Sequence, residues 1–139
     1  MATHERSRHT TAPAEGVWTI WSDTSTWPAW NPDVRAVSLA GPFRSGATGT
    51  MTTRAGTHDI RLENVVAGRS FDLVTSPAPA STFHFHCEVT PAQAGSRISQ
   101  GVSMSGPLGP LFSVLMGGRI ASTFEPILAG LAQEAERTS

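Results

Sequence analysis

Residues 107–137 read PLGPLFSVLMGGRIASTFEPILAGLAQEAER, and the rest of the expected fold is organised around them. This is the one segment both long and periodic enough for a principal helix. Its large apolar residues recur every three or four positions, at Leu108, Leu111, Phe112, Leu115 and Met116 and then at Ile120, Phe124, Ile127, Leu128, Leu131 and Ala135. Because this spacing places them on one broad face, we expect the helix to lie across the rest of the protein.

Two places in this segment weaken a helix. Gly117 and Gly118 stand together in its middle, and glycine gives the backbone more freedom than other residues. Pro126 lacks an N–H and its ring clashes with the carbonyl four residues earlier, so it should bend the helix. We predict that the first half faces a ligand through Phe112 and Met116, and that the second half packs as core. A helix that begins only after the two glycines is the alternative.

Most of the remaining chain has the period of two that is typical of strands. The expected strands are residues 4–11, 34–39, 46–54, 58–66, 69–75, 82–90 and 97–105, of which the first is polar on both faces. Residues 12–31 predict two short helices, the second with Trp27 and Trp30 on one side. Since short turns join consecutive strands, the sheet should be antiparallel and the fold class α+β.

The composition limits the compartment and the partners. With 139 residues the chain is most simply one domain, residues 1–139. Cys87 is the single cysteine, which excludes an internal disulfide and favours a reducing, cytoplasmic compartment. We expect no signal peptide and no membrane insertion, because no apolar run approaches about 20 residues. The ten basic residues are all arginine and are dispersed, which argues against nucleic acid as a partner.

Several motifs resemble one known family. Residues 12–43 read APAEGVWTIWSDTSTWPAWNPDVRAVSLAGPF, and residues 68–71 (GRSF), 95–98 (GSRI) and 105–108 (SGPL) follow in order. Together these motifs resemble the polyketide cyclase/dehydrase family of the START-like (SRPBCC) superfamily, which includes the major birch pollen allergen. They cover nearly the whole chain.

This resemblance implies a helix-grip fold, in which a curved seven-stranded antiparallel sheet wraps around a long C-terminal helix and two short helices follow the first strand. It also implies an apolar cavity between sheet and helix, in a single START-like ligand-binding domain. Members include lipid carriers, hormone receptors and aromatase/cyclase enzymes, often without metal or prosthetic group, so no cofactor is expected. The fold implies a cavity and no particular chemistry. The chain departs from the pattern at its polar first strand and at Gln100, where an apolar residue is more typical.

Alternation directs three polar side chains toward this cavity. His58 and Asn64 fall on the apolar face of their strand, and Gln100 falls on that of another. A buried imidazole or amide needs a partner in protein, water or ligand, so the alternative is a strand-end or satisfied structural group. For the two tryptophans the alternative is core packing. The predicted ligand-binding residues are Trp27, Trp30, His58, Phe71, Phe83, Phe85, Gln100, Met104, Phe112 and Met116.

Two other residue types raise the question of a metal or a nucleophile. His84 and His86 offer two nitrogens from one strand face, but no carboxylate or third histidine stands at a spacing that completes a metal site. They lie opposite the apolar face of their strand, so we expect a solvated outer position and no metal. Cys87 alternates onto the apolar face, where a buried, inert thiol is expected.

Three functions are compatible with these features. The first is binding of a small hydrophobic molecule, aromatic, polycyclic or lipid-like, between sheet and C-terminal helix. The second is a polyketide cyclase/dehydratase in which His58 is the acid or base and Gln100 donates to an enolate. Here the carboxylates of the strands alternate outward and tyrosine is absent, which leaves His58 as the titratable inward candidate. The third is a ligand-free interaction module, and the chain is expected to be a monomer or homodimer.

Overall fold

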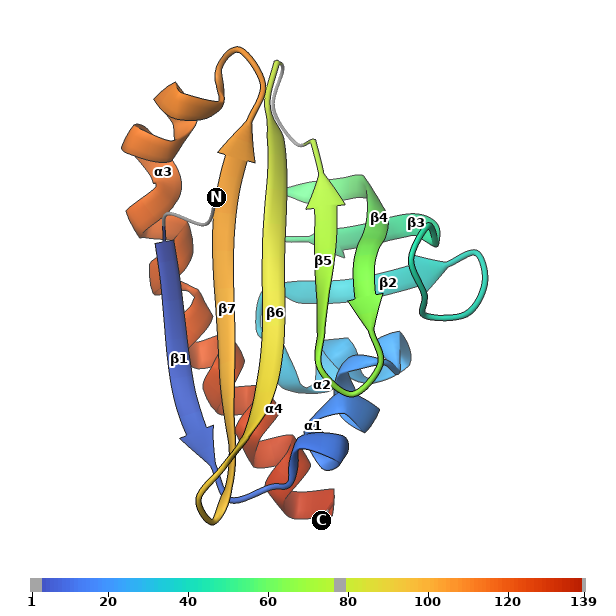
Figure 1. Cartoon of the computed structure of the whole chain (residues 1–139). Helices are drawn as coiled ribbons and strands as arrows, with labels where there is room; N and C mark the ends of the chain where they lie inside the picture. The colour runs from blue at the N-terminus through green and yellow to red at the C-terminus, as the bar shows by residue number, and fades with distance from the viewer. Residues whose placement is uncertain (1–3, 77–79, 139) are drawn as a thin grey trace.

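A seven-stranded sheet dominates the computed structural model, which describes residues 4–76 and 80–138. The strands are β1 (His4–Thr10), β2 (Val34–Leu39), β3 (Thr48–Thr53), β4 (Gly56–Val66), β5 (Ser70–Thr75), β6 (Thr82–Ala92) and β7 (Gly95–Ser105). Their order across the sheet is β1-β7-β6-β5-β4-β3-β2, so the first two strands of the chain form opposite edges (Figure 1). All neighbours are antiparallel, which confirms the predicted sheet.

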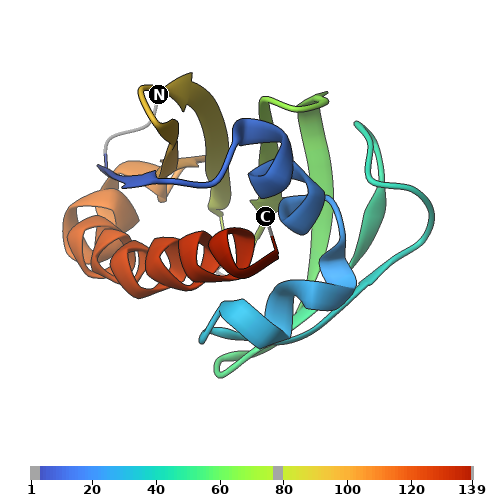
Figure 2. The same cartoon turned by 90° about the horizontal axis from the view of Figure 1, so that it is seen from below.

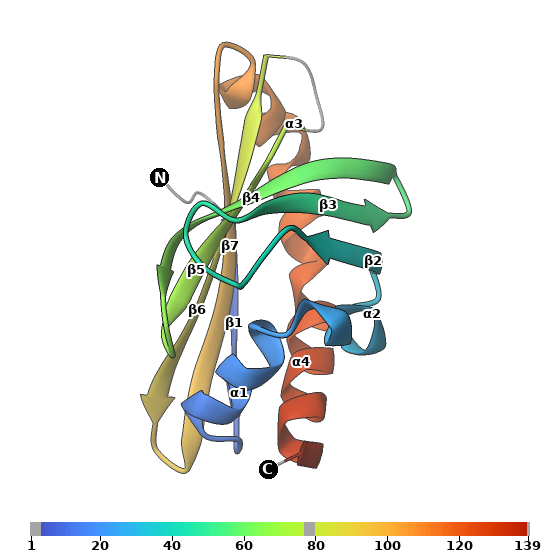
Figure 3. The ribbon, with the colours of Figure 1, turned by 90° about the vertical axis from the view of Figure 1, so that its right-hand side faces the viewer.

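The helices lie on the concave side of this sheet. They are α1 (Ala14–Trp21), the 3-10 turn η1 (Thr24–Thr26), α2 (Trp27–Trp30), α3 (Gly109–Ser122) and α4 (Phe124–Thr138). Figure 3 shows β2, β3 and β4 curving toward α4, with α1 and α2 below them. Figure 2 shows the same enclosure from below and confirms the helix-grip arrangement. None of the helices in residues 4–76 and 80–138 has the length and hydrophobicity of a membrane-spanning segment.

The C-terminal helix is broken at one position. α3 ends at Ser122 and α4 begins at Phe124, with Thr123 between them. Pro126 explains the break, because it has no N–H to donate to the Ser122 carbonyl and its ring clashes there. In α4 it falls in the first turn, where no intrahelical donor is needed. The predicted bend at Pro126 is confirmed. The predicted weak point at the two glycines, and the alternative start beyond them, are wrong because α3 runs through both.

α3 turns its small residues toward the sheet. Its buried residues are Gly109, Gly117 and Ala121. Leu111 and Leu115, which periodicity assigned to the packed face, are 52% and 65% exposed, and Val114 is 84% exposed. The small residues allow a close approach, since a side chain at Gly117 would collide with the ring of His4 in β1. The predicted packed face is therefore wrong for α3 and confirmed for α4, where the buried residues are Phe124, Ile127, Leu128, Leu131, Ala132 and Ala135.

The polar composition of β1 matches its position at the sheet edge. One side of the strand pairs with β7 over its whole length. Two of its polar side chains contact α4: Thr10 Oγ1 donates to Glu136 Oε2 at 2.7 Å, and Arg6 Nε lies 3.5 Å from Glu125 Oε2. The strand is therefore held by its backbone ladder and by polar contacts with the helix, and it needs no alternating apolar face.

A bulge in β4 turns one predicted cavity residue outward. The pairing with β5 shifts register between Glu63 and Val66, and Asn64 within this shift has a left-handed backbone with φ 51°. Asparagine adopts this conformation more readily than most residues. Asn64 is exposed and donates to Asp72 Oδ2 at 2.8 Å. The prediction that Asn64 faces the cavity is wrong, because a bulge changes the side on which the next side chains lie.

Phe71 is the centre of an aromatic cluster in the core. Its ring centroid lies 5.5 Å from that of Trp21 and 6.3 Å from that of Trp27. Trp18 and Phe43 complete the cluster, with centroids 6.1 and 5.0 Å from Phe71. Because α1 and α2 supply the tryptophans, the cluster joins these helices to the concave face of the sheet.

Candidate functional site

A pocket of about 320 Å³ lies between the concave face of the sheet and the helices. Aromatic and aliphatic side chains of four helices form one wall, namely Trp21, Trp27, Trp30, Ile120, Phe124 and Ile127. The volume is at the lower end of the range for small-molecule pockets, about 300–1,000 Å³. The pocket therefore has room for a small organic molecule.

The strand register builds the opposite wall. Phe71 in β5 pairs with Cys87 in β6, which pairs with Gln100 in β7, so these three side chains form one row. Directly paired residues share a face of the sheet. The next row contributes Leu73 and Phe85 to the pocket. These two rows are therefore apolar except at Gln100 and at the thiol of Cys87.

Seven of the ten predicted ligand-binding residues line the pocket, namely Trp27, Trp30, His58, Phe71, Phe83, Phe85 and Gln100. The other three lie outside its lining. Met104 packs partly buried against the core, Phe112 meets Phe83 with ring centroids 6.5 Å apart, and Met116 is 36% exposed. The prediction that the first half of the helix lines the cavity through Phe112 and Met116 is wrong. Since α3 buries its small face, the pocket is lined instead by residues at the helix break.

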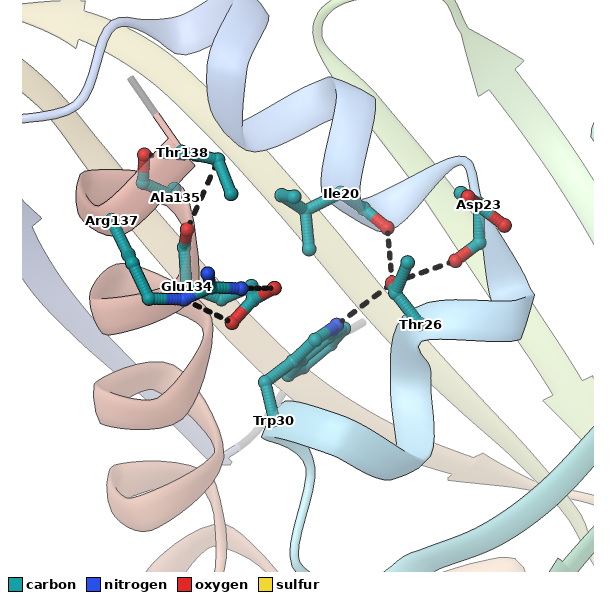
Figure 4. A network of polar contacts seen from close by, with 8 residues as sticks. All are labelled: Ile20, Asp23, Thr26, Trp30, Glu134, Ala135, Arg137 and Thr138. Atoms are coloured by element: carbon teal, nitrogen blue, oxygen red, sulfur yellow. Dashed lines mark hydrogen bonds and ion pairs between the residues drawn. The ribbon is translucent and has the colours of Figure 1, made fainter.

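Trp27 and Trp30 are both buried, and they serve the core as well as the pocket wall. Trp27 Nε1 donates to the Trp21 carbonyl at 2.9 Å, and Trp30 Nε1 donates to Thr26 Oγ1 at 3.1 Å. Figure 4 shows that the same Thr26 hydroxyl also reaches the carbonyls of Ile20 and Asp23. Both indole N–H groups are thus used inside the protein, so only the ring surfaces face the pocket.

Most polar groups in the lining are satisfied within the chain. Thr75 Oγ1 donates to the Asp59 carbonyl at 2.9 Å, and Thr123 Oγ1 donates to the Ile120 carbonyl at 2.6 Å. Three half-buried polar side chains of the described lining lack such partners. In the part of the chain that the structure describes, no hydrogen bond or ion pair engages the side chains of Asp33, His58 and Gln100.

Sequence reasoning missed Asp33 and the lining residues of the helix break. Asp33 lies between α2 and β2, outside any periodic segment, so no alternation assigns its side chain a direction. Ile120 and Thr123 line the pocket because α3 ends beside them. The signal that points to them is Pro126, which predicts where the helix is interrupted.

Residues 1–136 match the family described as polyketide cyclase/dehydrase and lipid transport. The chain belongs to this family. A comparison with curated protein sequences gave no match. Among solved structures, Ara h 8.0201 is 14% identical with a TM-score of 0.71, over 96% of both chains. Truncated norcoclaurine synthase from Thalictrum flavum is 12% identical with a TM-score of 0.71, over 93% of this chain and 89% of that one. A START superfamily protein from Mycobacterium smegmatis is 16% identical with a TM-score of 0.67, over 97% of both chains.

At these identities the solved structures support the fold alone. The polyketide cyclase and lipid transport family places the chain among proteins of the hydrophobic-ligand-binding type. The resemblance noted from the motifs is thereby confirmed.

Cys87 is buried in the pocket wall of this family member and carries an inert thiol. Burial raises the pKa of the thiol far above its ordinary value, and the nearby negative charge of Asp72 raises this pKa further. At neutral pH the group therefore stays protonated and is a poor nucleophile.

The His84 and His86 pair lies on the outer face of the sheet. His84 Nε2 is 3.2 Å from Ser105 Oγ, and His86 Nδ1 is 2.5 Å from Asp72 Oδ1. Asp72 pairs with His86 across β5 and β6, a neighbour that spacing along the sequence did not reveal. Among the residues that the structure describes, no group of three or more His, Cys, Asp or Glu side chains could hold a metal ion.

Proposed function

We propose that the chain binds a small hydrophobic molecule, of an aromatic, polycyclic or lipid-like kind, in the pocket between the sheet and the C-terminal helices. One ligand-binding domain spans residues 1–139 in this proposal. The observation that carries it is the mostly apolar pocket of about 320 Å³, in a fold whose family is of the hydrophobic-ligand-binding type. Such pockets combine apolar walls with a few polar groups that orient the ligand, the role we assign to His58 and Gln100.

Filling the pocket tests this proposal. N-phenyl-1-naphthylamine, a neutral dye that brightens in apolar surroundings, should bind the wild type. Ile120→Trp places a large ring into the pocket from α3, so we expect the dye affinity to fall by about tenfold or more, measured by fluorescence titration.

Val114→Trp is the matched control, since it adds the same ring to the exposed side of α3. It should leave the dye affinity unchanged, with both variants checked for folding by thermal unfolding. A folded Ile120→Trp that binds dye like the wild type would show that the dye lies elsewhere. Failure of the wild type to bind would overturn the proposal.

A second candidate function is a polyketide cyclase/dehydratase reaction. It is favoured by the three polar side chains without partners in the described pocket, namely Asp33, His58 and Gln100. His58 serves as the acid or base and Gln100 as the donor to a developing enolate. Norcoclaurine synthase shares the fold, which is evidence about the fold only.

We expect His58→Ala to slow turnover of a poly-β-ketone substrate by about 100-fold if this reaction occurs. Product formation would be followed by absorbance of the aromatised ring. His84→Ala removes a histidine from the outer face and should leave the rate unchanged. Equal rates for the two variants would remove His58 from the mechanism.

A further inference from the structure

We infer that the pocket selects a compact aromatic molecule of about two fused rings that carries a hydroxyl or carbonyl group, which Gln100 binds, and no negative charge. This inference rests on the proposed ligand-binding function. It adds the size, the polarity and the charge of the ligand, each of which follows from a separate observation.

The volume sets the size. An apolar cavity of about 150 Å³ accommodates one benzene ring. The pocket here has about 320 Å³, roughly twice that volume, so it accommodates about two fused rings. A long acyl chain or a four-ring skeleton exceeds this space unless part of it stays outside the mouth.

Gln100 sets the polar group that the ligand needs. Gln100 lies on β7, which is flanked by β1 on one side and β6 on the other. Its half-buried side chain points into the pocket, toward the helices. Its row neighbour Cys87 offers only a buried thiol, and its other row neighbour, Arg6, is engaged with Glu125. A carboxamide has one acceptor oxygen and two N–H donors. A ligand hydroxyl or carbonyl is the group that satisfies it, whereas an apolar ligand surface leaves it unpaired.

The charges in the lining set the charge of the ligand. Asp33 supplies a half-buried carboxylate, and no arginine of the described chain lines the pocket. A carboxylate ligand would therefore bring a second negative charge toward Asp33, and His58 is the one basic side chain in the described lining that could offset it. Like charges in a partly desolvated site repel more strongly than in water. The pocket thus discriminates against fatty acids and aromatic acids.

Three probes with one ring system test these steps. They are 2-naphthol, 2-methylnaphthalene, in which a methyl group replaces the hydroxyl, and 2-naphthoate, which carries a negative charge. Each competes with N-phenyl-1-naphthylamine at neutral pH, and the competition yields a dissociation constant. For the wild type we expect 2-naphthol to bind about tenfold more tightly than either analogue.

Two variants test whether Gln100 and Asp33 cause these differences in affinity. Gln100→Leu should abolish the preference for 2-naphthol over 2-methylnaphthalene, and Asp33→Asn should narrow the gap between 2-naphthol and 2-naphthoate. Gln133→Leu makes the same Gln-to-Leu change on the exposed face of α4 and should behave as the wild type.

The outcomes separate this inference from the function on which it rests. Dye binding with equal affinities for 2-naphthol and 2-methylnaphthalene, or a preference that persists in Gln100→Leu, overturns the role of Gln100 and leaves the binding function standing. Tighter binding of 2-naphthoate than of 2-naphthol overturns the charge selection. If no probe and no dye binds the wild type, both proposals fall. Because the wild-type comparison is decisive by itself, poor folding of a variant does not rescue the inference.

Discussion

Phe71→Ala should lower the free energy of unfolding by about 3–5 kcal/mol, the largest loss we expect from a single substitution in this protein. The side chain is 1% exposed, and its ring meets four other aromatic rings, those of Trp18, Trp21, Trp27 and Phe43. Removing it forfeits the burial of a whole aromatic side chain and leaves a cavity at the contact of α1 and α2 with the sheet. Urea unfolding followed by tryptophan fluorescence measures the loss.

The same substitution has a second consequence for the pocket. Phe71 lines the pocket, so the cavity left by alanine joins the existing space of about 320 Å³.

Phe112→Ala is the matched control for the loss of stability, because this ring is half-buried and lies outside the lining. We expect a loss of about 1 kcal/mol for Phe112→Ala, in proportion to its smaller burial. Equal losses for the two phenylalanines would contradict the central position assigned to Phe71.

Gly130→Ala should also destabilise the protein, by about 2 kcal/mol, although alanine is the better helix former by about 1 kcal/mol. Gly130 lies in α4 where this helix meets the end of α2, and a Cβ there would overlap the Trp30 carbonyl oxygen. The overlap involves backbone on both sides, so relief requires α4 to move away from α2. Thermal unfolding of the variant measures the loss.

Gly118→Ala gives the control with the opposite sign. Gly118 is exposed in α3, and a Cβ there meets nothing within 4 Å. The substitution should therefore raise the free energy of unfolding by up to about 1 kcal/mol through helix propensity alone. If Gly130→Ala stabilised the protein as much as Gly118→Ala, the result would contradict the close contact between α4 and the Trp30 carbonyl.

Five of the predicted pocket residues line the pocket because strand alternation is a local property. His58, Phe71, Phe83, Phe85 and Gln100 lie on strands whose side chains alternate between two faces, and the apolar face is the concave one. Asn64 broke this rule at a bulge, where one extra residue changes the count. Alternation makes no prediction for Asp33, because this residue lies between α2 and β2.

Helix α3 shows why a local pattern misjudged one surface. Periodicity identifies which residues share a face, and it assumes that the face with the larger side chains is the buried one. In α3 the distance to β1 and β7 decides instead, and the row of Gly109, Gly117 and Ala121 allows the closest approach. Periodicity therefore placed Phe112 and Met116 at the pocket, whereas close packing against the neighbouring strands buries the small residues of α3 instead.

Local patterns in the sequence predicted the seven strands, the two short helices, a C-terminal helical segment and their order, because propensity, alternation and turn residues act between near neighbours along the chain. The family followed from the resemblance of its motifs. The sequence also predicted the bend that Pro126 causes, since that clash lies within one helical turn. The tertiary structure was needed to show which side of α3 is buried, which of the predicted residues surround the pocket, and that Asp33 lines it together with His58 and Gln100. These outcomes depend on distances between segments far apart in the chain, which no local pattern contains.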